Sequence, residues 1–134
     1  MTTIFDKLEL PPAAKLLGWK LIFLDDELGH IEVEFEAKPE FLNPVGNIQG
    51  GLVTAMLDDT LGPAVFAMTK GEFFGNTVDL HTQFLRPVPV GKITTKAQVT
   101  KLGRNIAFMT GQLFDKDDHL CATATASAYL VKLK

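Results

Sequence analysis

Apolar and acidic residues alternate over residues 30–37, where Ile31, Val33 and Phe35 are separated by glutamates. This period of two predicts a strand with one buried face and one solvated face. A less regular apolar segment predicts a preceding strand over residues 19–28.

A different pattern follows in residues 49–68, which are apolar almost all round except for two adjacent carboxylates, Asp58 and Asp59. We expect a long buried helix here, because a helix without a polar face packs in a protein interior. The Gly62-Pro63 pair should kink or break this helix, since proline removes one helical hydrogen bond and clashes with the preceding turn.

The rest of the chain is rich in strand patterns. The first seventeen residues predict a short helical entry that is broken at a Pro-Pro pair, and residues 71–75 predict a loop. Strands in a meander around one apolar helix indicate an α+β fold, with an antiparallel sheet wrapped around the helix. The strands expected after the helix are residues 76–85, 91–102, 104–115 and 119–132, with hairpin turns at 101–105 and 115–119.

Composition narrows the class of protein. A length of 134 residues fits one domain, which we take as residues 1–134. The net charge of −3 argues against a nucleic-acid or anionic-membrane partner, and no apolar run has the length of a membrane span. The single cysteine, Cys121, lies in an apolar alternating segment and fits a core residue better than a nucleophile. One cysteine allows no intrachain disulfide, so we expect a cytoplasmic protein.

Four small or polar residues share one side of the predicted helix. At 100° per residue, Gly51, Thr54, Asp58 and Gly62 fall in one sector, where another backbone or a narrow ligand can approach closely. Asp58 is therefore either a structural acid bonded to a neighbouring strand or a working group of a site, and helix geometry weighs the two about equally. Asp59 falls in the neighbouring, bulkier apolar stripe.

The helix begins after a polar turn, residues 43–49, so its free N–H groups at Gly50 suit an oxyanion. Gly50 and Asp58 are separated by roughly 12 Å along the axis, at about 1.5 Å per residue. One carbonyl group cannot contact both of them in one chain. If both act, they come from two antiparallel helices in a C2 dimer, which forms the site twice.

These residues carry a resemblance to a known family. The ordered set resembles the hotdog-fold thioesterase superfamily, and within it the phenylacetic-acid-pathway and 4-hydroxybenzoyl-CoA thioesterase group. The resemblance spans about residues 43–129 and implies a hotdog fold. The motifs are Asn43, Gly46, Gln49-Gly50-Gly51 and Asp58, followed by Phe84-Leu85-Arg86-Pro87, Gly91 and Gly103-Arg104.

The resemblance also implies roles for individual residues. Asp58 matches the family's catalytic carboxylate, which acts as nucleophile or as general base for water. The Gly50 N–H matches the oxyanion donor, and Asn43 occupies the place of a side chain that helps to hold the carbonyl. This chain has Gln49 where the family usually has histidine, and Gly62 where some members have a serine or threonine that orients water.

Further expectations concern the substrate. Arg86 and Arg104, the latter beside Gly103, are candidate contacts for the phosphates of coenzyme A, because guanidinium groups suit phosphate. Four apolar residues either line an acyl pocket or belong to the core. They are Phe66, Met68, Phe73 and Phe74.

The sequence thus predicts a hydrolase that cleaves an acyl-CoA thioester, with no cofactor beyond the coenzyme A of the substrate and no metal. We expect a homo-oligomer, either a dimer or the homotetramer that is common in the family. The alternative is an acyl-CoA-binding protein on the same fold that does not hydrolyse its ligand. Gln49 in place of the usual histidine and Gly62 in place of a serine or threonine motivate this alternative.

Overall fold

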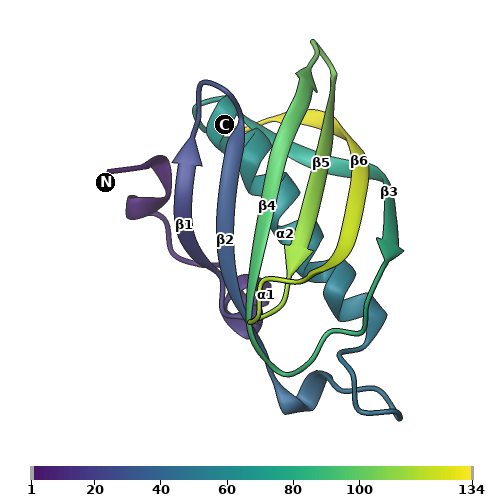
Figure 1. Cartoon of the computed structure of the whole chain (residues 1–134). Coiled ribbons are helices and arrows are strands. Elements are labelled where there is room, and N and C mark those ends of the chain that lie inside the picture. Colours follow the sequence, from purple (N-terminus) through teal and green to yellow (C-terminus); the bar gives the residue numbers. More distant parts are fainter. Residues whose placement is uncertain (1, 134) are drawn as a thin grey trace.

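The computed structural model describes residues 2–133, and its main feature is a six-stranded antiparallel sheet packed on one long helix (Figure 1). The α+β architecture predicted from the sequence is confirmed. The long helix is α2 (Gly50–Met68), preceded by the short helices η1 (Ile4–Lys7), α1 (Pro12–Leu17) and η2 (Pro39–Phe41). The strands are β1 (Lys20–Asp25), β2 (His30–Ala37), β3 (Phe73–Phe84), β4 (Gly91–Leu102), β5 (Ile106–Phe114) and β6 (Leu120–Lys132).

The strand order is β1-β2-β4-β5-β6-β3, so the predicted meander is wrong for one strand. Strand β2 pairs with β4, whereas β3 pairs with β6 at the far edge of the sheet. The helix α2 runs diagonally behind the sheet and ends near the β1–β2 turn, where Lys70 pairs with Asp26 at 3.0 Å, and β3 then crosses to the far edge (Figure 1). The predicted loop at 71–75 is also too long, because Phe73 already pairs with Lys132. Within residues 2–133, the outer edge of β3 has no partner strand.

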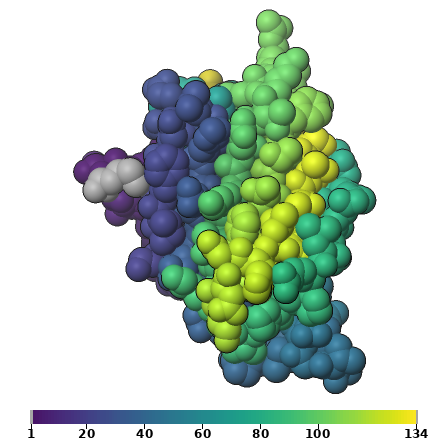
Figure 2. All heavy atoms as spheres, in the orientation of Figure 1, coloured from purple at the N-terminus to yellow at the C-terminus, as the bar shows by residue number. Residues whose placement is uncertain are grey.

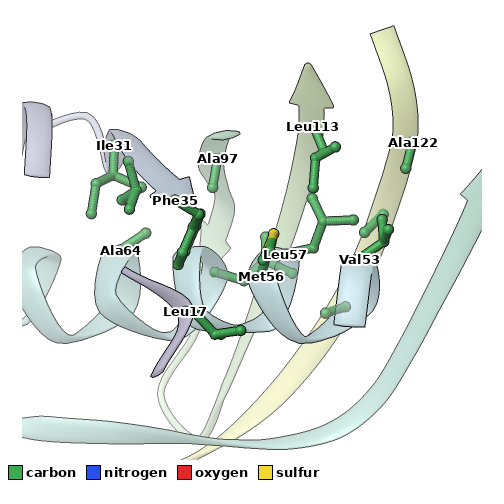
Figure 3. Packing of buried hydrophobic residues seen from close by; sticks show 14 of the residues in the cluster. Leu17, Ile31, Phe35, Val53, Met56, Leu57, Ala64, Ala97, Leu113 and Ala122 are labelled. Carbon is green, nitrogen blue, oxygen red and sulfur yellow. The ribbon is translucent and has the colours of Figure 1, made fainter. Parts of the chain in front are cut away.

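The core lies between α2 and the inner face of the sheet (Figure 3). The side chains of Val53, Met56 and Leu57 point from the helix toward the strands and are at most 1% exposed. Gly111 lies in the sheet beneath the helix, and a Cβ added there would lie 3.2 Å from Leu61 Cδ2. The small residue there lets the helix approach the sheet closely.

Pro63 lies inside α2, and the predicted break does not occur, because the helix continues to Met68. Proline has no N–H, so the carbonyl of Asp59, four residues earlier, lacks its helical donor. The indole Nε1–H of Trp19 donates to this carbonyl at 2.8 Å. A tertiary hydrogen bond therefore replaces the missing helical one and ties the entry of β1 to the middle of α2.

Replacing Trp19 with phenylalanine should destabilise the protein by about 1–3 kcal/mol, because the Asp59 carbonyl then has no donor. Phenylalanine keeps an aromatic ring beside Phe5, whose ring centroid lies 5.3 Å from that of Trp19. Urea unfolding of the two proteins measures the difference. A stability equal to that of the wild type would show that the hydrogen bond contributes nothing to folding.

The segment that leads into α2 projects from the lower end of the molecule (blue in Figures 1 and 2). Within this segment, Asn43 Oδ1 accepts the backbone N–H groups of Val45 and Asn47, both at 3.1 Å. The segment is therefore a tied turn and holds the start of the helix in place. No helix within residues 2–133 has the length and apolar character needed to cross a membrane.

Candidate active site

A groove of about 760 Å³ runs along the side of α2 that the sheet leaves uncovered. The N-terminal segment forms one wall, α2 forms the floor, and the start of β3 forms the other wall. Most of the lining is apolar, and the two adjacent carboxylates of α2 are among its few polar groups. The lining includes Leu17, Trp19, Ala55, Asp58, Asp59, Gly62, Pro63, Phe66, Phe74 and Thr77. Of the four candidate acyl-pocket residues, Phe66 and Phe74 line the groove, whereas Met68 and Phe73 do not.

Asp58 lies on the exposed side of this groove. The hydroxyl Oγ1 of Thr77 donates to Asp58 Oδ1 at 3.0 Å. Thr77 lies on β3 next to a bulge between Thr77 and Asp79, which turns the strand locally. Sequence reasoning did not find Thr77, because no local pattern links it to a helix residue nineteen positions earlier. The hydrogen bond orients the carboxylate while the second oxygen remains available.

Asp59 lies deeper in the groove than Asp58. Its carboxyl oxygen Oδ2 is buried and has no hydrogen-bond partner within residues 2–133. Burial, together with the charge of the neighbouring Asp58, raises the pKa of Asp59 to about 6. An unpaired buried carboxyl group is unfavourable for folding, so the side chain of Asp59 does not serve the stability of the fold.

Replacing Asp59 with asparagine should make the stability of the protein less sensitive to pH. In the unfolded chain this carboxyl ionises near its ordinary pKa of about 3.9, and in the fold near 6. The folded state therefore binds the proton more tightly, and wild-type stability falls as pH rises from about 4 to 6. The expected loss is on the order of 1–2 kcal/mol, after a reduction for solvent screening of a partly exposed group.

Urea unfolding at pH 4, 5, 6 and 7.5 measures this effect. The difference in unfolding free energy between Asp59→Asn and wild type should shift in favour of the variant over this range and level off above pH 7. Parallel pH profiles of the two proteins would contradict the assignment.

The small-residue side of α2 is open. A Cβ added at Gly51 or at Gly62 would meet no atom within 4 Å. Thr54, between them, shares a hydrogen bond with the hydroxyl of Thr82 on β3, at 3.2 Å. Gly62 lines the groove together with Asp58, whereas Gly51 and Thr54 lie beyond its end. This side of the helix leaves room for another backbone or a ligand.

The predicted oxyanion donor lies at the other end of the exposed helix face. Gln49 is the N-cap of α2 and forms no side-chain cap, and its carbonyl accepts the N–H groups of Leu52 and Val53. The N–H of Gly50 has no protein acceptor within residues 2–133. A Cβ added at Gly50 would lie 3.3 Å from the ring of Phe84 on β3. Gly50, Gln49 and Asn43 do not line the groove that holds Asp58, so one chain does not bring the predicted catalytic residues together.

The two candidate phosphate-binding arginines lie at opposite ends of β6. The N–H of Arg86 donates to the carbonyl of Cys121 at the start of β6, and Asn105, next to Arg104, accepts the N–H of Leu130 near its end. Nine residues of strand separate these two points, which is about 30 Å. Both arginines are exposed. Gly103 shapes the turn beside Arg104, because a Cβ there would lie 2.7 Å from the Ile106 carbonyl oxygen.

Two other groups of chemical interest have structural roles. Cys121 is buried, as predicted, and burial raises the pKa of its thiol. Asp115, Asp117 and His119 place potential ligand atoms within 4.8 Å of one another in the β5–β6 turn. Asp115 Oδ1 accepts the backbone N–H groups of Asp117 and His119, each at 2.9 Å, so this carboxylate holds the turn.

A six-stranded antiparallel sheet packed on one long central helix is the hotdog fold of the thioesterases. The sequence profile of the Thioesterase superfamily matches residues 45–122, more than half of the chain. The protein belongs to the Thioesterase superfamily, as its motifs suggested.

Individual relatives agree with this family. The phenylacetic acid degradation-related protein of Ralstonia eutropha JMP134 has a similar crystal structure, with a TM-score of 0.88 and 36% identity over 94% of this chain and 95% of that chain. A thioesterase family protein from Silicibacter pomeroyi has a TM-score of 0.83 and 25% identity, over 92% and 91% of the two chains. Human acyl-coenzyme A thioesterase 13 is 27% identical over 103 residues, which are 76% of this chain and 72% of that protein.

Proposed function

We propose that this protein hydrolyses the thioester bond of an acyl-coenzyme A in a site that two copies of the chain form together. The observation that carries the proposal is the position of Asp58, which is oriented by Thr77 at the mouth of an apolar groove. The similarity to human acyl-coenzyme A thioesterase 13 supports coenzyme A as the carrier of the acyl group.

Contacts along β3 support a dimer that completes the site. Asp58 lies beside Thr77, and Gly50 lies beside Phe84, so β3 carries both halves seven residues apart. Antiparallel pairing of two β3 edges, centred between residues 80 and 81, would set Thr77 opposite Phe84 of the second copy. Asp58 of one copy would then face Gly50 of the other.

The exposed edge of β3 favours such pairing. Unpaired strand edges tend to acquire a partner, and this one is twelve residues long. Its side chains include exposed apolar residues that a monomer would leave in water, namely Phe74, Val78 and Phe84, which are between 51% and 68% exposed. We therefore propose the dimer as the smallest active unit. If the protein forms a tetramer, this dimer would be one half of it.

The proposed hydrolysis uses Gly50 of one copy and Asp58 of the other. The thioester carbonyl oxygen would accept the N–H of Gly50, where the α2 N-terminus stabilises the developing negative charge. Asp58 of the other copy would either attack the carbonyl carbon or remove a proton from the attacking water. In both routes the C–S bond breaks, coenzyme A leaves as the thiolate and takes up a proton, and water supplies the new oxygen of the acid.

Of the two candidate phosphate-binding arginines, Arg86 follows Phe84 closely in the sequence. We therefore propose Arg86 as the phosphate contact nearer to Gly50.

The direct test is thiol release from a panel of acyl-CoA substrates with short, medium, branched and aromatic acyl groups. Turnover of at least one class is expected. Thermal stabilisation by acyl-CoA without thiol release would instead indicate a binding protein that does not hydrolyse its ligand, the alternative that Gln49 left open. Sedimentation at the assay concentration should give at least a dimer.

Thr77→Val should lower kcat by about tenfold, because it removes the hydrogen bond that orients Asp58 and keeps the shape of the side chain. Thr77→Ser, which retains the hydroxyl, should recover most of the rate. Steady-state kinetics on the best substrate of the panel measures both. Equal losses in the two variants would show that the hydroxyl alone does not account for the role of Thr77.

A further inference from the structure

The carboxyl group of Asp59 is a polar group of the groove that neither the fold nor the proposed reaction uses. Its backbone carbonyl holds Trp19, but no protein group donates to its buried Oδ2 atom within residues 2–133. The surrounding lining is apolar and comes from the N-terminal segment and the far side of α2, including Trp19, Pro63 and Phe66. An unpaired acceptor in a largely apolar groove is the arrangement of a specificity contact.

We propose that Asp59 recognises a hydroxyl group on the acyl chain and that the groove selects acyl groups hydroxylated close to the thioester. This inference rests on the proposed function, because it takes Asp58 as the group that acts on the carbonyl carbon. Asp59 lines the groove, and rotation about the Cβ–Cγ bond of its side chain presents either carboxyl oxygen to a ligand, whose hydroxyl donates the hydrogen bond that Oδ2 lacks.

The position of the hydroxyl follows from the helix. Asp58 and Asp59 are neighbours, so their Cα atoms are about 3.8 Å apart and their side chains diverge by about 100°. When the thioester carbonyl is held against Asp58, the side chain of Asp59 is therefore within reach of acyl carbon atoms only a few bonds from that carbonyl. The hydroxyl belongs on carbon 3 or 4 of the acyl group, and not at the end of a long chain.

The ionisation of Asp59 agrees with this role. Burial and the charge of Asp58 raise its pKa to about 6, so at pH 7.5 the group is mostly ionised and only accepts hydrogen bonds. A hydrogen bond to a charged acceptor contributes more to binding than one to a neutral acceptor. The same charge disfavours acyl groups that end in a carboxylate.

The test compares butyryl-CoA with 3-hydroxybutyryl-CoA. In the wild type, kcat/KM should be about 10- to 100-fold higher for the hydroxylated substrate, the range that one hydrogen bond to a charged group provides. Asp59→Ala should bring the ratio close to one. Asp59→Asn retains an acceptor oxygen and should keep part of the preference. Asp117→Ala, which removes an exposed carboxylate in the β5–β6 turn, is the matched control and should keep the wild-type ratio.

A second pair tests the position of the hydroxyl. Hexanoyl-CoA and 6-hydroxyhexanoyl-CoA should be turned over at similar rates or with the hydroxylated member slower. A wild-type ratio of one or less for the butyryl pair would overturn the proposal, as would an unchanged ratio in Asp59→Ala. A stronger preference for the terminal hydroxyl would overturn the placement next to the thioester.

Binding separates this proposal from the proposed function. In the Asp58→Asn background, calorimetry should give a lower Kd for 3-hydroxybutyryl-CoA than for butyryl-CoA, and Asp59→Ala in that background should remove the difference. If the wild type releases no thiol from any substrate, the proposed hydrolysis fails, yet this binding difference still decides the role of Asp59. Equal binding of the pair, or no binding of either member, would overturn the recognition proposal.

Discussion

Replacing Asp58 with asparagine is expected to lower kcat by about 10²- to 10⁴-fold on any acyl-CoA that the wild type hydrolyses. Asparagine keeps the size of the side chain and an oxygen that can accept the Thr77 hydroxyl. It removes the negative charge that nucleophilic attack or proton removal requires. Thiol release under saturating substrate measures the loss.

Folding provides the control for this variant. Asp58 is exposed and its helix packs through other residues, so the melting temperature should stay within a few degrees of the wild type. A variant that folds normally and retains full turnover would remove Asp58 from the mechanism. A variant that binds substrate with unchanged Kd and no turnover would support it.

Replacing Gly50 with proline is expected to lower kcat by about 10²- to 10³-fold, because it deletes the N–H proposed to stabilise the oxyanion. This position is the first of α2, where proline is well tolerated. The preceding residue, Gln49, already has the extended backbone that a following proline requires, with φ −54° and ψ 133°. Gly50→Ala keeps the N–H and meets only the movable ring of Phe84, so it should retain most of the rate.

Mixing the two inactive variants tests whether the site is shared. A mixed dimer of Asp58→Asn and Gly50→Pro subunits has one intact site, made from the unaltered Gly50 of one copy and the unaltered Asp58 of the other, and one doubly altered site. After co-refolding at equal concentrations, random pairing should restore about a quarter of the wild-type rate. No recovery, in a mixture shown to exchange subunits, would place both groups of each site in one chain.

The fold was largely predictable from local patterns. The alternation around Val33 identified β2, and the apolar run after Gln49 identified α2 to its last residue, because both periods reflect burial on one element. Strand pairing was not predictable, since nothing local states that β3 joins β6. The unbroken course of α2 through Pro63 was not predictable for the same reason. Pro63 leaves the carbonyl of Asp59 without a helical donor. This carbonyl accepts the indole N–H of Trp19, which lies forty residues earlier in the chain.

The candidate site likewise combines local features that the sequence predicts with contacts across the fold that it does not. The spacing on the helix wheel correctly placed Gly62 and Asp58 on one open side of α2, because helical geometry is local. Contacts made across the fold were not visible in the sequence. Thr77 reaches Asp58 only once β3 lies beside α2, and the unpaired state of the Asp59 carboxyl depends on every side chain around it.

Trp19, whose indole is held by the hydrogen bond to the backbone of Asp59, is also a natural fluorescent probe of the groove. The chain has one tryptophan, and its indole lies in the wall of the groove. Intrinsic fluorescence therefore comes mainly from one known position, which contacts the backbone of Asp59, the residue next to Asp58. Occupation of the groove can be followed by emission in rapid-mixing experiments, without a label and separately from bond cleavage.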